Sequence, residues 1–394
     1  MTKTTQALRS REWSGGRGCV GTAVLCLSFL YAAGMPAQQP DAAAIGDGTP
    51  TYTTFDAPGA GTGTDQGTFG YAINTAGVAT GDYSDASYVF HGFVRAANGD
   101  ITTFDAPGAG TGAGQGTFGY GIDTAGVVTG YYTDANGVDH GFLRAASGAI
   151  TTFNAAGAGT GSGQGTFALY INAGGVVSGY YTDANGVNHG FVRAAGGAIT
   201  PFNAPGAGTA SGQGTFGYGI NTARTIVGLY GDASNVGHGF VRAANGVFTT
   251  IDAPGAGTAA HQGTSAYAIN TGGVIVGGYL DASNVNHGFA RATNGVITPF
   301  DAPGAGTAAT QGTFGQAINT SGAIAGYFID ASNMHHGYVR SASGDIAPFN
   351  FPGAAGYGTL GTGIDAAGVI VGWYQDASSA YHGFLRTARR AAKR

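Results

Sequence analysis

One short motif recurs at a fixed interval along most of this chain, and this repeat restricts the possible folds more than any other feature. The motif His-Gly-Phe, or His-Gly-Tyr in one copy, begins at positions 49 residues apart, except that the last interval is 46 residues. Fixed periods of about 20–50 residues are typical of chains that stack one supersecondary unit on copies of itself. The sequence therefore predicts a repeat array rather than unrelated domains. The copies begin at His91, His140, His189, His238, His287, His336 and His382.

Each repeat divides into four short segments that alternate as β-strands do. In the second repeat, residues 116–123 place Phe118, Tyr120 and Ile122 on one face and glycines on the other. An Asn-Gly turn, a strong hairpin signal, joins the second segment to the third. The 3.6-residue period of a helix is absent. Four antiparallel strands in a repeat of this length fit a β-propeller blade, whereas the coil of a parallel β-helix is shorter.

The two ends of the repeat region complement each other. It begins at Thr51 with a fourth strand that has no blade before it, and it ends with a third strand from His382 that has no fourth strand after it. Pairing the N-terminal strand with the C-terminal hairpin would complete one blade and remove the open sheet edge. A linear solenoid would need capping units. We therefore expect an all-β, seven-bladed propeller of four-stranded antiparallel blades over residues 51–388.

The remaining segments have other expected roles. Residues 1–37 combine arginines, an apolar run of about 15 residues and small residues, which is the pattern of a cleaved secretory signal. Residues 38–50 are expected to be a linker, and 389–394 a basic tail. Both cysteines, Cys19 and Cys26, lie in the signal, so no cysteine is left for a disulfide or a metal site. We expect a secreted protein, extracellular or periplasmic, with no stable membrane span after cleavage.

Units such as "INAGGVVSGYYTDANGVNHGF" resemble the bacterial extracellular HAF repeats, named after a His-Ala-Phe tripeptide. The resemblance extends from about Tyr52 to Arg386 and includes the Ile-Asn-x-x-Gly turn and the Val-x-Gly-x-Tyr strand. This chain has glycine where the tripeptide has alanine, as at Gly92, Gly141 and Gly190. The resemblance implies export and a repeat fold, and it implies no reaction.

Composition argues against several classes of function. Charged residues are only 9% of the chain and the formal net charge is −5, so a basic surface for nucleic acid is not expected. Nucleotide fingerprints, phosphate loops with a lysine and ordered catalytic triads are also missing from the sequence. We expect no cofactor and no resident metal.

An Asp-x5-His pair brackets one hairpin in every repeat, and it is the clearest candidate constellation. It could be an acid–base dyad, but near-identical copies on separate blades do not converge on one substrate. We therefore expect a structural hydrogen bond in each pair. Whether the Asp-Ala-Asn-Gly turns bind calcium stays open, since the terminal glutamate of a calcium loop is missing. The pairs are Asp85 and His91, Asp134 and His140, Asp183 and His189, Asp232 and His238, Asp281 and His287, Asp330 and His336, and Asp376 and His382.

Ligand contacts are better sought where the repeats differ. Gln316 replaces an inner-strand tyrosine, His261 is an extra histidine, and Trp373 replaces a tyrosine of other repeats. We take these three as ligand-binding candidates. The arginine that recurs once per repeat is expected to pair with a carboxylate such as Asp105.

The expected function is a secreted, non-enzymatic binding or scaffold protein. Its partner would be an extracellular glycan or protein, held on the face formed by the glycine-rich loops and the "DANGV" turns. One alternative is a hydrolase or lyase acting on polysaccharide at the central channel. Another is a purely structural envelope protein.

Overall fold

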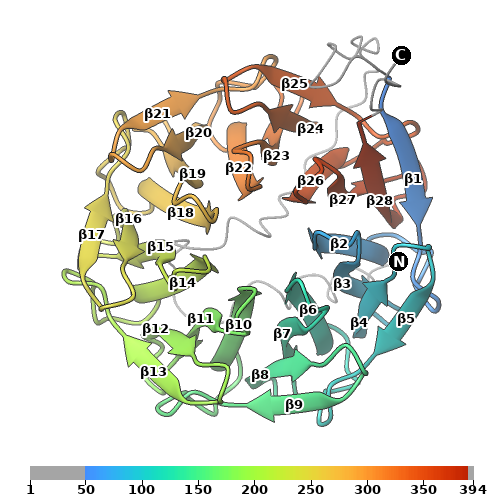
Figure 1. Ribbon diagram of the computed structural model, residues 1–394, viewed down its shortest axis with the longest axis horizontal. Helices are drawn as coiled ribbons and strands as arrows, with labels where there is room; N and C mark the ends of the chain where they lie inside the picture. Colours follow the sequence, from blue (N-terminus) through green and yellow to red (C-terminus); the bar gives the residue numbers. More distant parts are fainter. Residues whose placement is uncertain (1–48, 389–394) are drawn as a thin grey trace, which may run out of the picture.

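The computed structural model describes residues 49–388, which form 28 β-strands joined in one sheet and contain no helix. The predicted signal (1–37), most of the linker (38–50) and the tail (389–394) lie outside the described residues. Figure 1 shows the strands arranged in a propeller-like ring around a centre. Among residues 49–388, no helix is long and apolar enough to cross a membrane.

Each repeat supplies an inner, a second, a third and an outer strand, paired antiparallel in that order (Figure 1). The inner strands are β2 (Gly67–Ile73), β6 (Gly116–Ile122), β10 (Gly165–Ile171), β14 (Gly214–Ile220), β18 (Gly263–Ile269), β22 (Gly312–Ile318) and β26 (Thr359–Ile364). The second strands are β3 (Ala79–Ser84), β7 (Val128–Thr133), β11 (Val177–Thr182), β15 (Ile226–Gly231), β19 (Ile275–Leu280), β23 (Ile324–Ile329) and β27 (Ile370–Gln375). The third strands are β4 (Phe90–Arg95), β8 (Asp139–Arg144), β12 (Asn188–Arg193), β16 (Gly237–Arg242), β20 (Asn286–Arg291), β24 (His335–Arg340) and β28 (Tyr381–Thr387). The outer strands are β1 (Thr51–Phe55), β5 (Ile101–Phe104), β9 (Ile150–Phe153), β13 (Ile199–Phe202), β17 (Phe248–Ile251), β21 (Ile297–Phe300) and β25 (Ile346–Phe349).

The two ends of the described chain close the ring. Strand β1 pairs antiparallel with β28, from Thr51 opposite Thr387 to Phe55 opposite Gly383. The predicted pairing of the N-terminal strand with the C-terminal hairpin is therefore confirmed. Strand β1 provides the outer strand that the last repeat lacks, and it covers the edge of β28 that would otherwise be open.

The buried core is a set of aromatic layers between neighbouring units. The third strand of each unit buries one aromatic ring at 0–1% exposure, for example Phe93, Phe191 and Tyr338. The glycine before this residue faces an aromatic ring of the outer strand in most units. A Cβ added at Gly190 would overlap the Phe202 ring. This close packing leaves no room for an alanine side chain at the motif glycine in most units without movement of the facing ring.

A belt of side-chain hydrogen bonds joins successive inner turns. The Asn74 Oδ1 atom accepts from the backbone N–H groups of Ala76 and Val78, and its Nδ2 donates to the Asp123 carbonyl of the next unit at 2.9 Å. Two turns carry aspartate instead, Asp123 and Asp365, and an ionised aspartate has no donor for this link. The matching links run from Asn172 to Asn221, Asn221 to Asn270, Asn270 to Asn319 and Asn319 to Asp365.

The ring has two different faces. The first residue of each inner strand lies beside the first residue of the preceding third strand, as Gly116 lies beside Phe90. The long loops that lead into the inner strands and the turns between second and third strands therefore emerge on one side, which we call the loop face. The other two kinds of turn form the opposite side, the turn face.

Candidate functional site

Every hairpin histidine on the loop face contacts two partners. The ring Nε2 lies 3.1–3.7 Å from the aspartate that precedes it in the Asp-x5-His pair. The Nδ1 atom makes a shorter contact, 2.8–2.9 Å, to the residue that follows the outer strand. Each ring also stacks on an aromatic side chain of the second strand, as His91 does on Tyr83. The second polar partner was missed because it lies 14 residues away, beyond the hairpin.

The chemistry of the second partner differs between units. His91 lies between two carboxylates, Asp85 and Asp105, and the hydrogen bond to Asp105 is the main cause of its raised pKa. His140 instead has the Asn154 amide at Nδ1. Both kinds of bridge tie a hairpin to the loop beside it. Because each bridge stays within its own part of the ring, the copies do not converge on a reaction centre.

The recurring arginines do not form the predicted ion pairs, and that prediction is wrong. Asp105 is engaged by His91. The guanidinium of Arg144 instead lies over the Phe104 ring of the preceding unit at 5.0 Å, and Arg193 lies over Phe153 at 4.8 Å. A planar guanidinium stacks favourably on an aromatic face, so a buried arginine can be held without a carboxylate.

The three predicted ligand contacts lie in different units. Gln316 is the bulged residue of β22, and its Nε2 is buried with no hydrogen-bond partner among the described residues. His261 precedes β18 on the loop face, at a φ of 69°. Trp373 lies in β27 at 9% exposure and contacts Phe69 edge to face. The structure does not bring these three together, although Trp373 borders the site described next.

Two residues beside the ring closure hold strained backbone conformations. Asp65 has a φ of 59° and Tyr88 a φ of 62°. The matching positions are glycine in some repeats, as at Gly114 and Gly137. In others they are non-glycine residues with the same positive φ: His261 and Thr310 match Asp65, and Asn235, Asn284, Asn333 and Ser379 match Tyr88. Left-handed backbone costs a non-glycine residue about 1–2 kcal/mol. Such strain marks candidate functional positions.

These two residues belong to one cluster, which we call the joint site: Thr64, Asp65, Tyr88, Gln375 and Tyr381. The Tyr88 hydroxyl donates to the Thr64 carbonyl at 3.0 Å. The Asp65 Oδ1 atom accepts from the Tyr381 hydroxyl at 3.3 Å and from the Gln375 amide at 3.4 Å. Asp65 Oδ2 is buried and has no hydrogen-bond partner in the described chain. Burial is the main cause of the raised pKa of Asp65.

The shorter last repeat makes the joint site different from the matching places in the other repeats. In the other long loops a glutamine fastens the loop, as Gln115 does by accepting from the Gly112 N–H and donating to the Ala135 carbonyl. The shortened loop has Tyr357 at that position. Gln375 takes over the role, and its Oε1 accepts from the Tyr357 N–H at 2.7 Å.

An aromatic cluster packs against Tyr381 of the joint site. Tyr357 stacks on His335 at 3.9 Å and lies 5.5 Å from Trp373, and Trp373 contacts Tyr381. Burial is the main cause of the lowered pKa of His335, which is about 4, so this histidine is neutral at ordinary pH. The cluster therefore adds apolar surface and no charge next to the joint site.

Sequence reasoning found Trp373 but missed Tyr88 and Asp65. The signal was present in the second-to-third turn, because "DASYV" has tyrosine where other repeats have glycine, asparagine or serine. This turn needs a positive φ at that position. A bulky residue such as tyrosine rarely adopts a positive φ, so its presence there is unusual.

Comparison with known proteins leaves the family undetermined, since no family model and no curated protein matches the chain. Solved structures that are similar include a puromycin hydrolase mutant (12% identity, TM-score 0.47, covering 82% of this chain and 50% of that one). The BP39L lectin of Burkholderia pseudomallei is similar too (10%, TM-score 0.46, covering 70% and 81%), as is the six-bladed fucose-recognising lectin of Aleuria aurantia (14%, TM-score 0.40, covering 70% and 92%). The chain spans about half the length of the puromycin hydrolase. Likeness at this level is no guide to ligand or reaction.

Proposed function

We propose that this chain is a secreted, non-enzymatic carbohydrate-binding protein built as a seven-bladed β-propeller with four strands per blade. The strand pairings support this blade arrangement, because each antiparallel set of inner, second, third and outer strands corresponds to one repeat, and β1 completes the last set. The apolar segment within residues 1–37 and the likeness to HAF repeats support export.

The joint site on the loop face is the proposed binding surface, and the strained Tyr88 is the observation that carries the proposal. Tyr88 is half-buried, and it is an aromatic residue at a turn where the other repeats have glycine, asparagine or serine. An aromatic ring fixed at a surface gives an apolar platform for the C–H face of a sugar. Thr64, which is exposed, and Asp85, which is half-buried, lie nearby and provide oxygen atoms that hydrogen-bond to sugar hydroxyls.

Binding explains the arrangement better than catalysis does. The raised pKa of Asp65 would suit an acid, but its free Oδ2 is buried rather than open to a substrate. The Asp–His bridges are repeated and lie apart. A strained aromatic beside fixed hydrogen-bonding groups is what recognition of a polar, ring-shaped ligand requires.

Tyr88→Gly tests the proposal, with Asn235→Gly at the matching turn of another repeat as control. The full chain would be titrated by calorimetry with soluble oligosaccharides of glucose, galactose, mannose, fucose and N-acetylglucosamine. We expect at least one to bind saturably, a loss of tenfold or more in Tyr88→Gly, and unchanged affinity in Asn235→Gly. Both variants relieve a positive φ, so neither should unfold the ring. Absence of saturable binding, or equal affinity in Tyr88→Gly, would overturn the proposal.

A further inference from the structure

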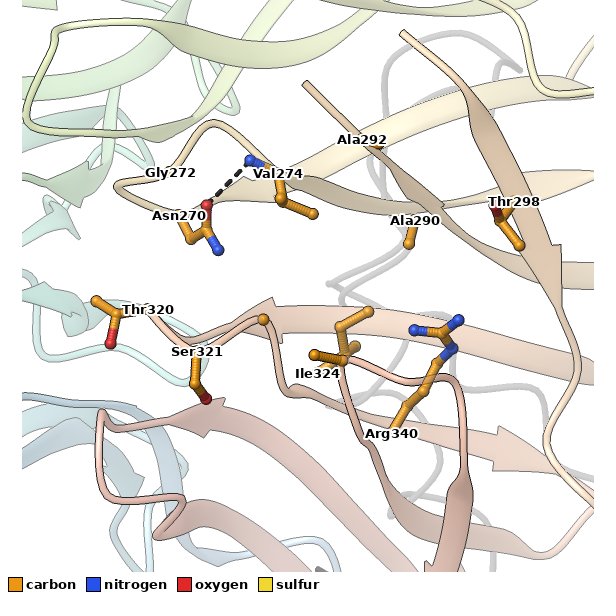
Figure 2. Close-up of a pocket in the computed structure, with 12 residues that line it drawn as sticks. Asn270, Gly272, Val274, Ala290, Ala292, Thr298, Thr320, Ser321, Ile324 and Arg340 are labelled. Atoms are coloured by element: carbon orange, nitrogen blue, oxygen red, sulfur yellow. Dashed lines mark hydrogen bonds between the residues drawn. The ribbon is translucent and has the colours of Figure 1, made fainter. Parts of the chain in front are cut away.

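A groove of about 400 Å³ opens on the turn face between two neighbouring units, away from the joint site. Figure 2 shows Asn270, Val274 and Ala290 on one side of it, and Ile324 and Arg340 on the other. Its volume is within the range of about 300–1,000 Å³ that is usual for small-molecule sites. The groove is therefore large enough for a small organic ligand.

One small side chain distinguishes the interface at which this groove lies. Ala290 lines it in β20, and a larger aliphatic residue stands at the same strand position in the other units. Those side chains pack in the cores between units, as Val241 does. Ala290 also packs against a core cluster, but its side chain fills less space there. The residues at the matching positions are Val94, Leu143, Val192, Val241, Val339 and Leu385.

Arg340 gives the groove a positive charge that has no ion-pair partner within residues 49–388. Its guanidinium lies 4.9 Å from the Phe300 ring centre, and Nη1 donates to the Ser341 carbonyl at 3.2 Å. Within residues 49–388 no carboxylate lies at ion-pair distance from it, and its Nε has no hydrogen-bond partner. Burial is the main cause of the lowered pKa of Arg340, whereas the negative charge of Asp345 acts to raise that pKa. The guanidinium remains charged, because arginine does not deprotonate in proteins.

The rest of the lining separates into apolar and polar parts. Val274 and Ala290 provide a half-buried aliphatic wall, and Ile324, 1% exposed, lies behind it. Val296, 57% exposed, lies in the turn between two lining residues. The Asn270 amide is already engaged, accepting from the Val274 N–H at 2.9 Å and donating to the Asn319 carbonyl. Exposed hydroxyl groups lie at the rim: Thr298, Thr320 and Ser321.

The turn face as a whole also favours an anion. The described arginines all lie at the turn-face ends of third strands or in an inner turn, whereas most aspartates lie on the loop face. A negatively charged ligand therefore meets a more favourable field on the turn face than on the loop face. The arginines are Arg95, Arg144, Arg193, Arg224, Arg242, Arg291, Arg340 and Arg386.

We propose that this groove binds a small aliphatic carboxylic acid. The carboxylate accepts hydrogen bonds from the outward N–H groups of Arg340, in the planar geometry that guanidinium and carboxylate share. The hydrocarbon part lies on Val274 and Ala290. The proposal is independent of glycan binding on the opposite face.

Hexanoate and its neutral counterpart hexanamide would be titrated against the full chain by ligand-observed NMR. We expect saturable hexanoate binding and at least tenfold weaker hexanamide binding. Ala290→Val restores the residue of other units, so it should keep the fold and weaken hexanoate tenfold or more. Arg340→Gln should do the same, whereas Arg242→Gln, which removes an arginine stacked in the same way over Phe202, should leave binding unchanged.

Three results would overturn the proposal. They are absence of saturable hexanoate binding, equal affinity for acid and amide, and unchanged affinity in Ala290→Val. Because Ala290→Val inserts a side chain that other units already accommodate, the test does not depend on whether Arg340→Gln folds.

Discussion

The belt of inner-turn hydrogen bonds is interrupted where the last unit meets the first, and Asp365→Asn should repair it. The Asp365 Oδ1 atom accepts from the N–H groups of Ala367 and Val369 at 2.8 Å, as Asn74 does in its own turn. An asparagine in place of Asp365 would keep this orientation. Its Nδ2 would then face the Asn74 carbonyl, completing the link seen from Asn319 to the Asp365 carbonyl at 3.0 Å.

The expected gain has two parts. One added hydrogen bond contributes about 0.5–1.5 kcal/mol to the free energy of unfolding. The substitution also removes a carboxylate whose pKa is raised in the folded state, chiefly by burial. A raised carboxyl pKa means that its stabilising contribution is present at low pH and is lost as pH rises through the folded pKa. The asparagine side chain does not titrate, so the gain should be larger at neutral pH than near pH 4.

Calorimetric unfolding of the full chain at pH 7 and pH 4 would measure both parts. We expect the Tm of Asp365→Asn to exceed that of the wild type by roughly 1–3 °C at pH 7, because 1 kcal/mol shifts the Tm by about 2–4 °C in domains of 150–250 residues and by less in a larger ring such as this. The advantage should shrink at pH 4. Asn319→Asp, which breaks an existing link, should lower the Tm at pH 7. An Asp365→Asn protein no more stable than wild type at pH 7, or equally favoured at both pH values, would refute the reasoning.

Two further predictions concern the recurring His-Gly-Phe motif and its histidine. Gly190→Ala should lower the free energy of unfolding by about 1–3 kcal/mol in denaturant titration, because its Cβ overlaps the Phe202 ring. Gly239→Ala should cost clearly less, since the facing residue is isoleucine and the nearest atom is 3.1 Å away; equal losses would contradict this. Asp105→Asn should lower the pKa of His91 in an NMR titration, because the hydrogen bond to Asp105 is the main cause of its elevation. An unchanged His91 pKa would show that Asp105 is not the cause.

Much of the architecture could be read from the repeat. Strand alternation and turn residues are local properties, and they predict the all-β ring and its closure by β1 and β28. The sequence also predicted that the long loops and the second-to-third turns share one face, because consecutive antiparallel strands alternate in direction.

The partners of charged side chains could not be read in the same way. The second partner of His91 is 14 residues away, and the aromatic partner of Arg144 lies in the preceding unit. Asp65 meets Tyr381 and Gln375 only because the ring closes, although more than 300 residues separate them in the chain.

The sequence by itself thus determined which segments are strands, how long each repeat is and which ends meet, since each follows from patterns within one repeat. Only the tertiary structure decided what surrounds each side chain. Ring closure placed the strained Asp65 against the last unit, and packing of neighbouring units placed Ala290 and Arg340 in the lining of one groove. Contacts between units depend on how neighbouring repeats pack in space, and a pattern within one repeat contains no record of that packing.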